Sequence, residues 1–265
     1  MKIVDNEKKE VKQEKVIDKE IKKDNFWQIK DLPSKFKLYP VDTIIKGRLL
    51  KVLDIKLLST IDEDNFNDII NDVLKRNIIG IDINELTVPD KMYIIFWLRA
   101  NSYKESGYEI NFDCIKCKKP ATYNFSLDCL NVLYIKDGFN VNKTITLPMC
   151  GDKLSFTYLR IKDELNVEKF INKYETNIVK YNKDILNIAT VMTTVNGEEK
   201  VLQEKYDYLV DLKEPADYGY IEAYLKHIDI GISPILNVTC NNCGGSALSR
   251  VTFRGDFFTP SYNFG

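Results

Sequence analysis

The 265-residue sequence predicts an α+β fold, in which a β-rich body with a core helix carries a helical insertion. The order of the segments supports this prediction: an α/β stretch is followed by strands, then by helices, then by strands again. A doubly wound parallel sheet needs regular alternation of strands and helices, which this chain lacks. A second observation is a pair of C-x-x-C sequences, each of which lies between two strand-like runs.

The composition is that of a chain with a substantial core and balanced charge. Hydrophobic residues make up 44% of the chain, and 38 Lys and Arg stand against 39 Asp and Glu, for a net charge of −1. This balance argues against a protein that works mainly by neutralising nucleic-acid phosphates. No apolar run approaches the roughly 18 residues of a membrane span, and the N-terminus lacks the apolar stretch of a secretory signal.

The sequence carries no recognisable catalytic motif. It contains one histidine, His227, and neither a glycine-rich phosphate loop nor a G-x-S-x-G nucleophile sequence. No nucleophile stands beside an acid–base partner. We therefore expect no enzymatic activity and no small-molecule substrate.

The first 42 residues differ from the rest of the chain. Residues 1–24 form a charged N-terminal arm in which fifteen side chains are Lys, Asp or Glu, so the arm cannot build its own core. It is either a solvated tail or an arm that orders on a neighbouring subunit. Residues 25–42 contain two prolines and several aromatic residues, and we expect an extended strap that lies on a surface. That surface belongs either to the same chain or to a partner.

Residues 43–161 are predicted to form the body. Residues 43–52 have the composition of a strand, residues 54–59 of a short helix, and residues 64–76 have the apolar spacing of a longer helix. A further helix begins near Pro89, with Thr87 as its cap, and is apolar nearly all round. It is the candidate core helix.

The second half of the chain returns to strands, then helices, then strands. Residues 143–147 and 153–160 alternate around a turn. We expect a helical insertion over 162–233, with helices near 163–174, 176–193, 203–210 and 215–228. Residues 234–265 complete the chain with C-terminal strands around the second C-x-x-C.

Four of the six cysteines form two closely spaced pairs, Cys114 with Cys117 and Cys240 with Cys243. Two such turns supply the four sulfur ligands of a tetrahedral zinc ion. We therefore predict a split four-cysteine zinc ribbon with one structural Zn²⁺ per chain, in which 122 residues between the pairs are closed by the metal. All four ligand positions are filled, so no site remains for water or substrate.

Other readings of the cysteines are two disulfides, a thioredoxin-like redox site or chance pairing. Disulfides suit a small secreted chain, and a redox site uses a single C-x-x-C that opens a helix. Cys129 and Cys150 have no acid–base partner nearby in the sequence, and we expect both to be core thiols.

Several motifs resemble the baseplate hub protein family of T4-like contractile-tailed bacteriophages. The similarity covers residues 30–135 and 235–260, while Phe36 stands where a glycine is expected. The residues that carry it are Leu32-Pro33-Ser34, Leu38-Tyr39-Pro40, Asp90, Tyr93, Arg99, Ser102, Tyr103, the two cysteine pairs and Phe257-Phe258-Thr259-Pro260.

The resemblance implies a structural or assembly role in the phage tail baseplate, with other baseplate or tail proteins as partners and no catalytic residues. It places the protein in the virion, after synthesis in the host bacterial cytoplasm. Phe26, Trp27 and Tyr39 are the candidate partner-contact residues, because aromatic side chains concentrate interface energy. Packing within the same chain is the alternative for these three residues.

The alternative function is a zinc-ribbon module that binds nucleic acid or acts in transcription. Lys116, Lys118 and Lys119 give this reading a small basic patch. The balanced charge and the lack of a continued basic and aromatic surface argue against it.

Overall fold

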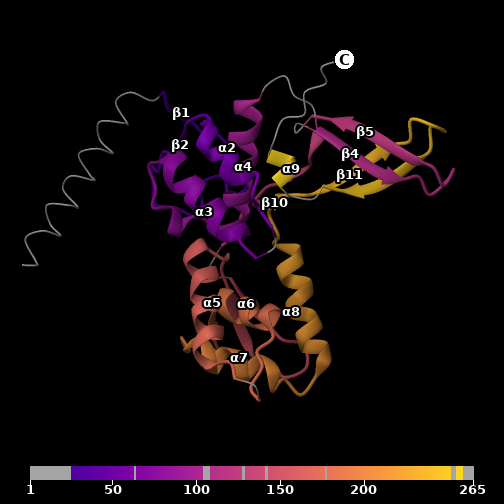
Figure 1. The fold of residues 1–265 in the computed structure, drawn as a ribbon. Coiled ribbons are helices and arrows are strands. Elements are labelled where there is room, and N and C mark those ends of the chain that lie inside the picture. The colour runs from indigo at the N-terminus through magenta and orange to yellow at the C-terminus, as the bar shows by residue number, and fades with distance from the viewer. Residues whose placement is uncertain are drawn as a thin grey trace, which may run out of the picture.

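The structure is a computed structural model, and it describes residues 25–62, 64–103, 108–126, 129–140, 143–176, 178–251 and 255–258. The charged arm predicted over 1–24 lies outside these residues, as do Thr259 and Pro260. Figure 1 shows three parts: an upper body, a lower lobe, and a pair of hairpins that project sideways from the body. Helices and small antiparallel sheets make up all three, as expected for an α+β chain.

The upper body combines a small antiparallel sheet with three α-helices. Its strands lie in the order β1-β2-β3. The strand predicted over 43–52 is only two residues long, and a helix begins at Val52. The elements are β1 (Trp27–Gln28), β2 (Lys46–Gly47), α2 (Val52–Leu58), α3 (Phe66–Asn77), β3 (Ile78–Ile79), the 3-10 helix η1 (Ile83–Glu85) and α4 (Val88–Ser102).

Helix α4 is the core helix that the sequence predicts. The Thr87 hydroxyl accepts a hydrogen bond from the Asp90 N–H, and a proline stands in the first turn, where it lacks only an N–H that has no partner in a helix. Ile94, Ile95 and Leu98 are buried in the largest hydrophobic cluster, together with residues of α2, α3 and the C-terminal α9 (Gly255–Phe258).

The segment 25–42 packs on its own body, and the extended strap predicted there is wrong over 33–39. Successive backbone hydrogen bonds, among them Lys35 N–H to Leu32 O at 2.8 Å and Tyr39 N–H to Phe36 O at 3.2 Å, fold it into turns. Phe36 has φ +59°, the left-handed region that favours glycine. This explains why a glycine is expected at this position.

The lower lobe has its own core. Strands β7 and β8 pair as predicted. They contribute to a buried hydrophobic cluster that also includes Ala189, Leu209 and Ile221 from the later helices. The lobe therefore begins before residue 162, the predicted start of the insertion. Its elements are β7 (Thr144–Thr146), β8 (Lys153–Phe156), α5 (Ile161–Tyr174), α6 (Lys183–Val191), β9 (Met192–Val195), α7 (Leu202–Val210) and α8 (Pro215–His227).

Strand β9 corrects the end of the helix predicted over 176–193. It pairs with β8 to complete the sheet in the order β7-β8-β9. The Asn196-Gly197 turn that follows has φ +53° and φ +84° at its two residues, a pair that favours hairpin turns. The β-branched residues before this turn favour a strand over a helix.

Two hairpins form the projecting arm of Figure 1, which we call the ribbon arm. Each is a two-stranded antiparallel sheet, and the strands of one are not paired with those of the other. The arm's strands are β4 (Tyr108–Asp113), β5 (Pro120–Phe125), β11 (Ile235–Thr239) and β12 (Ser246–Arg250). Strands β6 (Val132–Leu133) and β10 (Gly231–Ile232) pair near its base. Among the described helices, none is long and apolar enough to span a membrane.

Candidate metal centre

The first C-x-x-C turn connects β4 to β5 at the end of the ribbon arm. The Lys118 N–H donates to the Cys114 carbonyl at 2.8 Å, and the Cys114 N–H donates to the Lys119 carbonyl at 3.0 Å. These bonds reverse the chain within six residues and place both thiols of the turn on one side. We call this turn, residues 114–119, the first knuckle.

The second C-x-x-C turn, between β11 and β12, repeats this geometry. The Gly244 N–H donates to the Cys240 carbonyl at 2.9 Å, and the Cys240 N–H donates to the Gly245 carbonyl at 2.8 Å. The Asn242 N–H also lies 3.4 Å from the Cys240 sulfur. We call residues 240–245 the second knuckle; its hydrogen bonds match those of the first position by position.

One equivalent position differs between the knuckles in a way that affects stability. Both knuckles need a left-handed residue after the second cysteine, with φ +58° at Lys118 and φ +66° at Gly244. Glycine adopts this conformation freely, whereas a residue with a Cβ pays about 1 kcal/mol or more. The first knuckle therefore retains a lysine side chain where glycine fits better.

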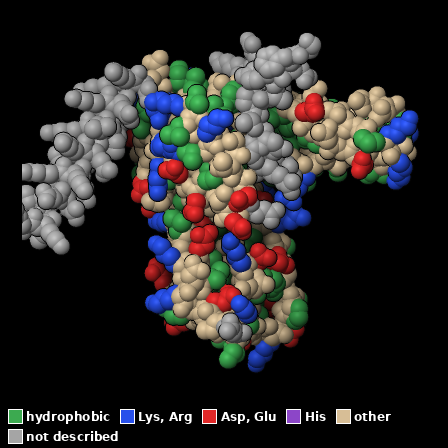
Figure 2. Space-filling model, viewed as in Figure 1, with side chains coloured by type: hydrophobic (Ala, Val, Ile, Leu, Met, Phe, Trp, Pro, Cys, Tyr) green, Lys and Arg blue, Asp and Glu red, His purple; other side chains and the backbone are tan. Residues whose placement is uncertain are grey.

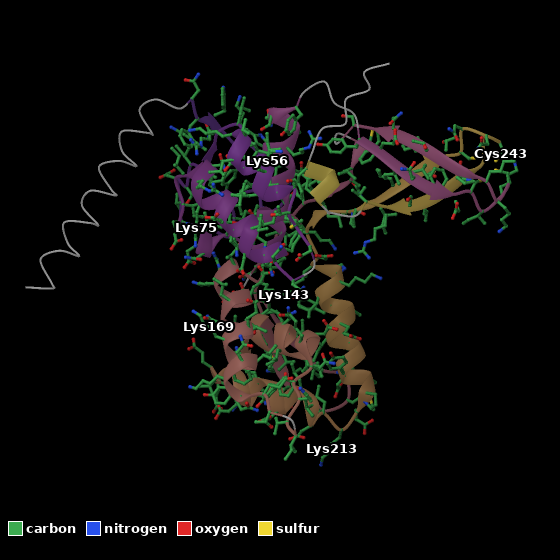
Figure 3. The ribbon with its side chains drawn as sticks, in the orientation of Figure 1. Lys56, Lys75, Lys143, Lys169, Lys213 and Cys243 are labelled. Atoms are coloured by element: carbon green, nitrogen blue, oxygen red, sulfur yellow. The ribbon has the colours of Figure 1, made fainter. Side chains whose placement is uncertain are left out.

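The two knuckles bring the four thiols of the C-x-x-C pairs together, as the sequence predicts. The Sγ atoms of Cys114 and Cys243 are 3.7 Å apart, and those of Cys117 and Cys240 are 3.8 Å apart. All four sulfurs lie within 4.8 Å of one another. Figure 3 shows the sulfur of Cys243 among the strand ends at the tip of the ribbon arm.

The sulfurs are arranged for a metal ion rather than for disulfides. Each S–S separation is far longer than the roughly 2.0 Å of a disulfide bond. Cys114 and Cys240 are buried, while Cys117 and Cys243 are half-buried. A group of four thiols that converge on one point can hold a metal ion as their common partner.

The thiols of the cluster differ in how readily they ionise. Hydrogen bonding from the backbone N–H of Cys117 lowers the pKa of the Cys114 thiol to about 6. The Gly245 N–H favours the Cys243 thiolate, but burial and the sulfur of Cys114 outweigh it and raise the pKa of Cys243 to about 11. Four thiolates repel one another, so full deprotonation requires a bound cation.

Two contacts join the knuckles independently of any metal. The Asn242 side-chain amide donates to the Pro120 carbonyl at 2.8 Å. A Cβ at Gly245 would lie 3.0 Å from Cδ of Lys116, so the glycine leaves room for this flexible side chain of the first knuckle. Sequence reasoning missed both contacts. Alignment of the two C-x-x-C turns on each other sets Gly-Gly opposite Lys-Lys, which is a signal for the special role of Gly245 but not for the bond from Asn242.

Cys129 and Cys150 are exposed, so the prediction that they are core thiols is wrong. Cys129 follows β5 in a short turn, where its N–H donates to the Ser126 carbonyl. Cys150 lies in the β7–β8 turn, which Asp217 of α8 holds by accepting hydrogen bonds from the Met149 and Cys150 N–H groups at 2.9 and 3.0 Å. A turn at the surface exposes whichever side chain it carries.

The three predicted contact residues have different environments. Trp27 is 46% exposed, and Phe26 is half-buried. Tyr39 is buried: its hydroxyl donates to Asp90 Oδ2 at 2.5 Å and accepts from the Thr87 N–H at 3.1 Å. The prediction that Tyr39 contacts a partner is therefore wrong, since its ring and hydroxyl are used inside the body.

Residues from separate motifs of the resemblance meet around Asp90. Besides Tyr39, the buried carboxylate accepts from the Ser34 N–H at 3.0 Å and from the Thr87 hydroxyl at 3.0 Å. Burial, with the nearby carboxylate, raises the pKa of Tyr39 well above its ordinary value, so the hydroxyl remains a donor. The network fastens segment 33–39 to the start of α4.

Comparisons with known proteins agree with these motifs. The family model described as "T4 bacteriophage base plate protein" matches residues 14–259, a span that includes the body, the lower lobe and the ribbon arm. No curated protein and no solved structure matches the chain. A match to this family indicates a structural protein of the phage tail. The chain belongs to the T4 bacteriophage base plate protein family.

Proposed function

We propose that this protein is a structural subunit or assembly factor of the hub region of the phage baseplate, and that it acts through contacts with other tail proteins. The single observation that carries the proposal is the family match over residues 14–259, which spans every part of the described fold. The proposed location is the tail of the virion, reached after synthesis in the bacterial cytoplasm.

We further propose that the four cysteines hold one structural Zn²⁺. Zinc binds thiolates at about 2.3 Å, and a regular tetrahedron of that radius has edges of about 3.8 Å. The separations of 3.7 and 3.8 Å between sulfurs of opposite knuckles fit that edge. Bound zinc would add a stabilising link between β4–β5 and β11–β12, which belong to distant parts of the chain.

The proposed role of the metal is mechanical. The ribbon arm projects from the body, and its two hairpins share no backbone pairing. A four-sulfur centre at the free end would keep the hairpins side by side and fix the direction of the arm. A subunit that must contact several neighbours at once needs surfaces with a fixed relative geometry.

A second contact surface is proposed around Trp27. Trp27 borders a hollow of about 410 Å³ that is also lined by Leu49, Trp97 and Asn101. Trp27 and Leu49 are exposed, and aromatic side chains beside a hollow are typical of interface anchors. The charged arm 1–24 precedes this surface in the sequence and is proposed as a further contact element.

The experiment that tests the proposal is quantitative mass spectrometry of purified, density-banded phage particles. We expect the chain at a fixed ratio to a known tail protein in complete particles. An assembly factor would be present in isolated baseplate intermediates and depleted from complete particles. Absence from both would contradict the proposed function.

A further inference from the structure

The tip of the first knuckle carries an unusual concentration of positive charge. Lys116, Lys118 and Lys119 are all exposed, while the second knuckle contains no charged residue. Figure 2 shows Lys and Arg side chains gathered at the free end of the ribbon arm. We call residues 115–119 the lysine tip.

The three lysines have no counter-charge of their own. Within the part of the chain that the structure describes, none of them forms an ion pair or a hydrogen bond through its side chain. Asp113, at the end of β4, is the one acidic residue in the sequence from 113 to 120, and it leaves the tip with a positive excess.

Lys118 is retained against a backbone preference. It occupies a left-handed position at φ +58°, and the equivalent residue of the second knuckle is Gly244 at φ +66°. Strain at a non-glycine residue points to a use for the side chain. The aliphatic stem of Lys116 lies close to Gly245 of the second knuckle.

An apolar residue lies within this basic surface. Ile115 is 71% exposed. Leu248 of the neighbouring hairpin β11–β12 is also exposed, while the exposed Ile235 lies at the end of that hairpin away from the knuckle. Exposed isoleucine and leucine gain from contact with a protein surface and gain little from a phosphate backbone. Three lysines also neutralise few phosphates, which argues for a protein partner rather than nucleic acid.

We propose that the lysine tip docks onto an acidic surface of a neighbouring tail protein, with Ile115 at the centre of the contact and the lysines around it. This inference rests on the proposed function and names the part of the chain that meets a partner. The knuckle geometry presents the tip at the end of a projecting arm, where it reaches a subunit beyond the body.

Charge reversal in the full-length chain tests the proposal. One variant combines the substitutions Lys116→Glu, Lys118→Glu and Lys119→Glu. It is supplied to a phage that lacks the wild-type gene. We expect at least a tenfold lower amount of the variant in density-banded particles, with its metal content unchanged. A matched control reverses three exposed lysines on other elements, Lys56, Lys169 and Lys213, which are labelled in Figure 3.

Each outcome has a separate meaning. Normal incorporation of the tip variant, with wild-type chain present in particles, would overturn this inference and leave the proposed function intact. Equal loss of the tip variant and the control variant would also overturn it, because net charge alone would explain the loss. Absence of the wild-type chain from all particles and intermediates would overturn the proposed function, and the inference with it.

A second measurement does not depend on charge reversal. Ile115 is replaced by the photo-crosslinking residue p-benzoylphenylalanine, and the phage particles are irradiated after they have assembled. We expect a crosslink to an Asp- and Glu-rich segment of another tail protein. A crosslink to DNA, or to no macromolecule in assembled particles, would overturn the proposal.

Discussion

The Sγ atoms of Cys114 and Cys243 lie 3.7 Å apart although 129 positions separate the two residues in the sequence. The lower lobe lies between them along the chain, so the contact joins the middle of the sequence to its last strands. The hairpins that carry these cysteines are not paired with each other, so side-chain contacts hold them together, among them the sulfurs and the buried apolar residues around them.

We predict that Cys243→Ser loosens the second hairpin. Loss of one thiolate weakens a tetrahedral zinc centre, and structural zinc contributes several kcal/mol to folding. The expected result is a fall of roughly 10 °C in the melting temperature. Faster amide hydrogen exchange is expected in β11 and β12. Cys129→Ser is the matched control, because Cys129 is exposed and lies outside the cluster. Equal melting of both variants and the wild type would show that the two pairs share no metal.

A reciprocal pair of substitutions tests the left-handed position of the knuckles. Lys118→Gly should stabilise the folded chain by about 0.5–1 kcal/mol, because relief of strain outweighs the added freedom of the unfolded chain. Gly244→Ala should destabilise it by about 1 kcal/mol through φ alone, since no atom lies within 4 Å of the added Cβ. Urea denaturation of the zinc-loaded protein measures both. Changes of the same sign would contradict the account.

Tyr39→Phe should destabilise the body by about 2 kcal/mol, because the buried Asp90 carboxylate loses a donor. This corresponds to a fall of about 4–8 °C in the melting temperature. Tyr134→Phe removes a similar hydroxyl-to-carboxylate bond, to Asp31, at an exposed site and should change stability little. An equal effect of the two substitutions would contradict a special role for burial.

The stability of the lower lobe should depend on Asp217 in a pH-dependent way. Burial alone would raise the pKa of Asp217, but hydrogen bonds from the Met149 and Cys150 N–H groups hold it below its usual range. A lowered pKa gives stability that is present above the unfolded-state pKa of about 3.9 and is lost as the pH falls through the lower folded-state pKa.

Asp217→Asn should therefore lower the urea midpoint at pH 7, and its difference from the wild type should shrink as the pH falls below about 4. Asp211→Asn, at an exposed residue after α7, serves as the control. A difference between wild type and Asp217→Asn that stays constant with pH would rule out this contribution of the carboxylate.

Short sequence patterns correctly predicted the turns and helix ends that neighbouring residues determine. The spacing of the cysteines predicted both knuckles, because a two-residue gap is a property of the turn itself. The convergence of the knuckles was predicted from the need of a tetrahedral metal for four ligands. Thr87 and Pro89 predicted the start of α4, since caps act within one turn. The motifs that resemble the baseplate family led to the assignment that the family model supports.

Long-range features other than the cysteine cluster escaped prediction. The bond between Tyr39 and Asp90 joins residues 51 positions apart, and nothing in the periodicity around Tyr39 separates a buried aromatic residue from an exposed one. Average tendencies also failed at single positions: cysteine is usually buried, yet Cys129 and Cys150 lie in surface turns. The start of the lower lobe was missed because β7 and β8 share a core with helices that come later in the chain.

The central claim is that four cysteines from two distant hairpins hold one zinc ion. Native mass spectrometry of the full-length protein, purified after zinc-supplemented expression, tests it most directly. The account predicts a mass that exceeds the metal-free chain by one zinc per chain, and loss of that zinc in the Cys243→Ser variant. Less than one-tenth of a zinc per chain in the wild type, or a mass lowered by the hydrogens lost in two disulfides, would contradict it.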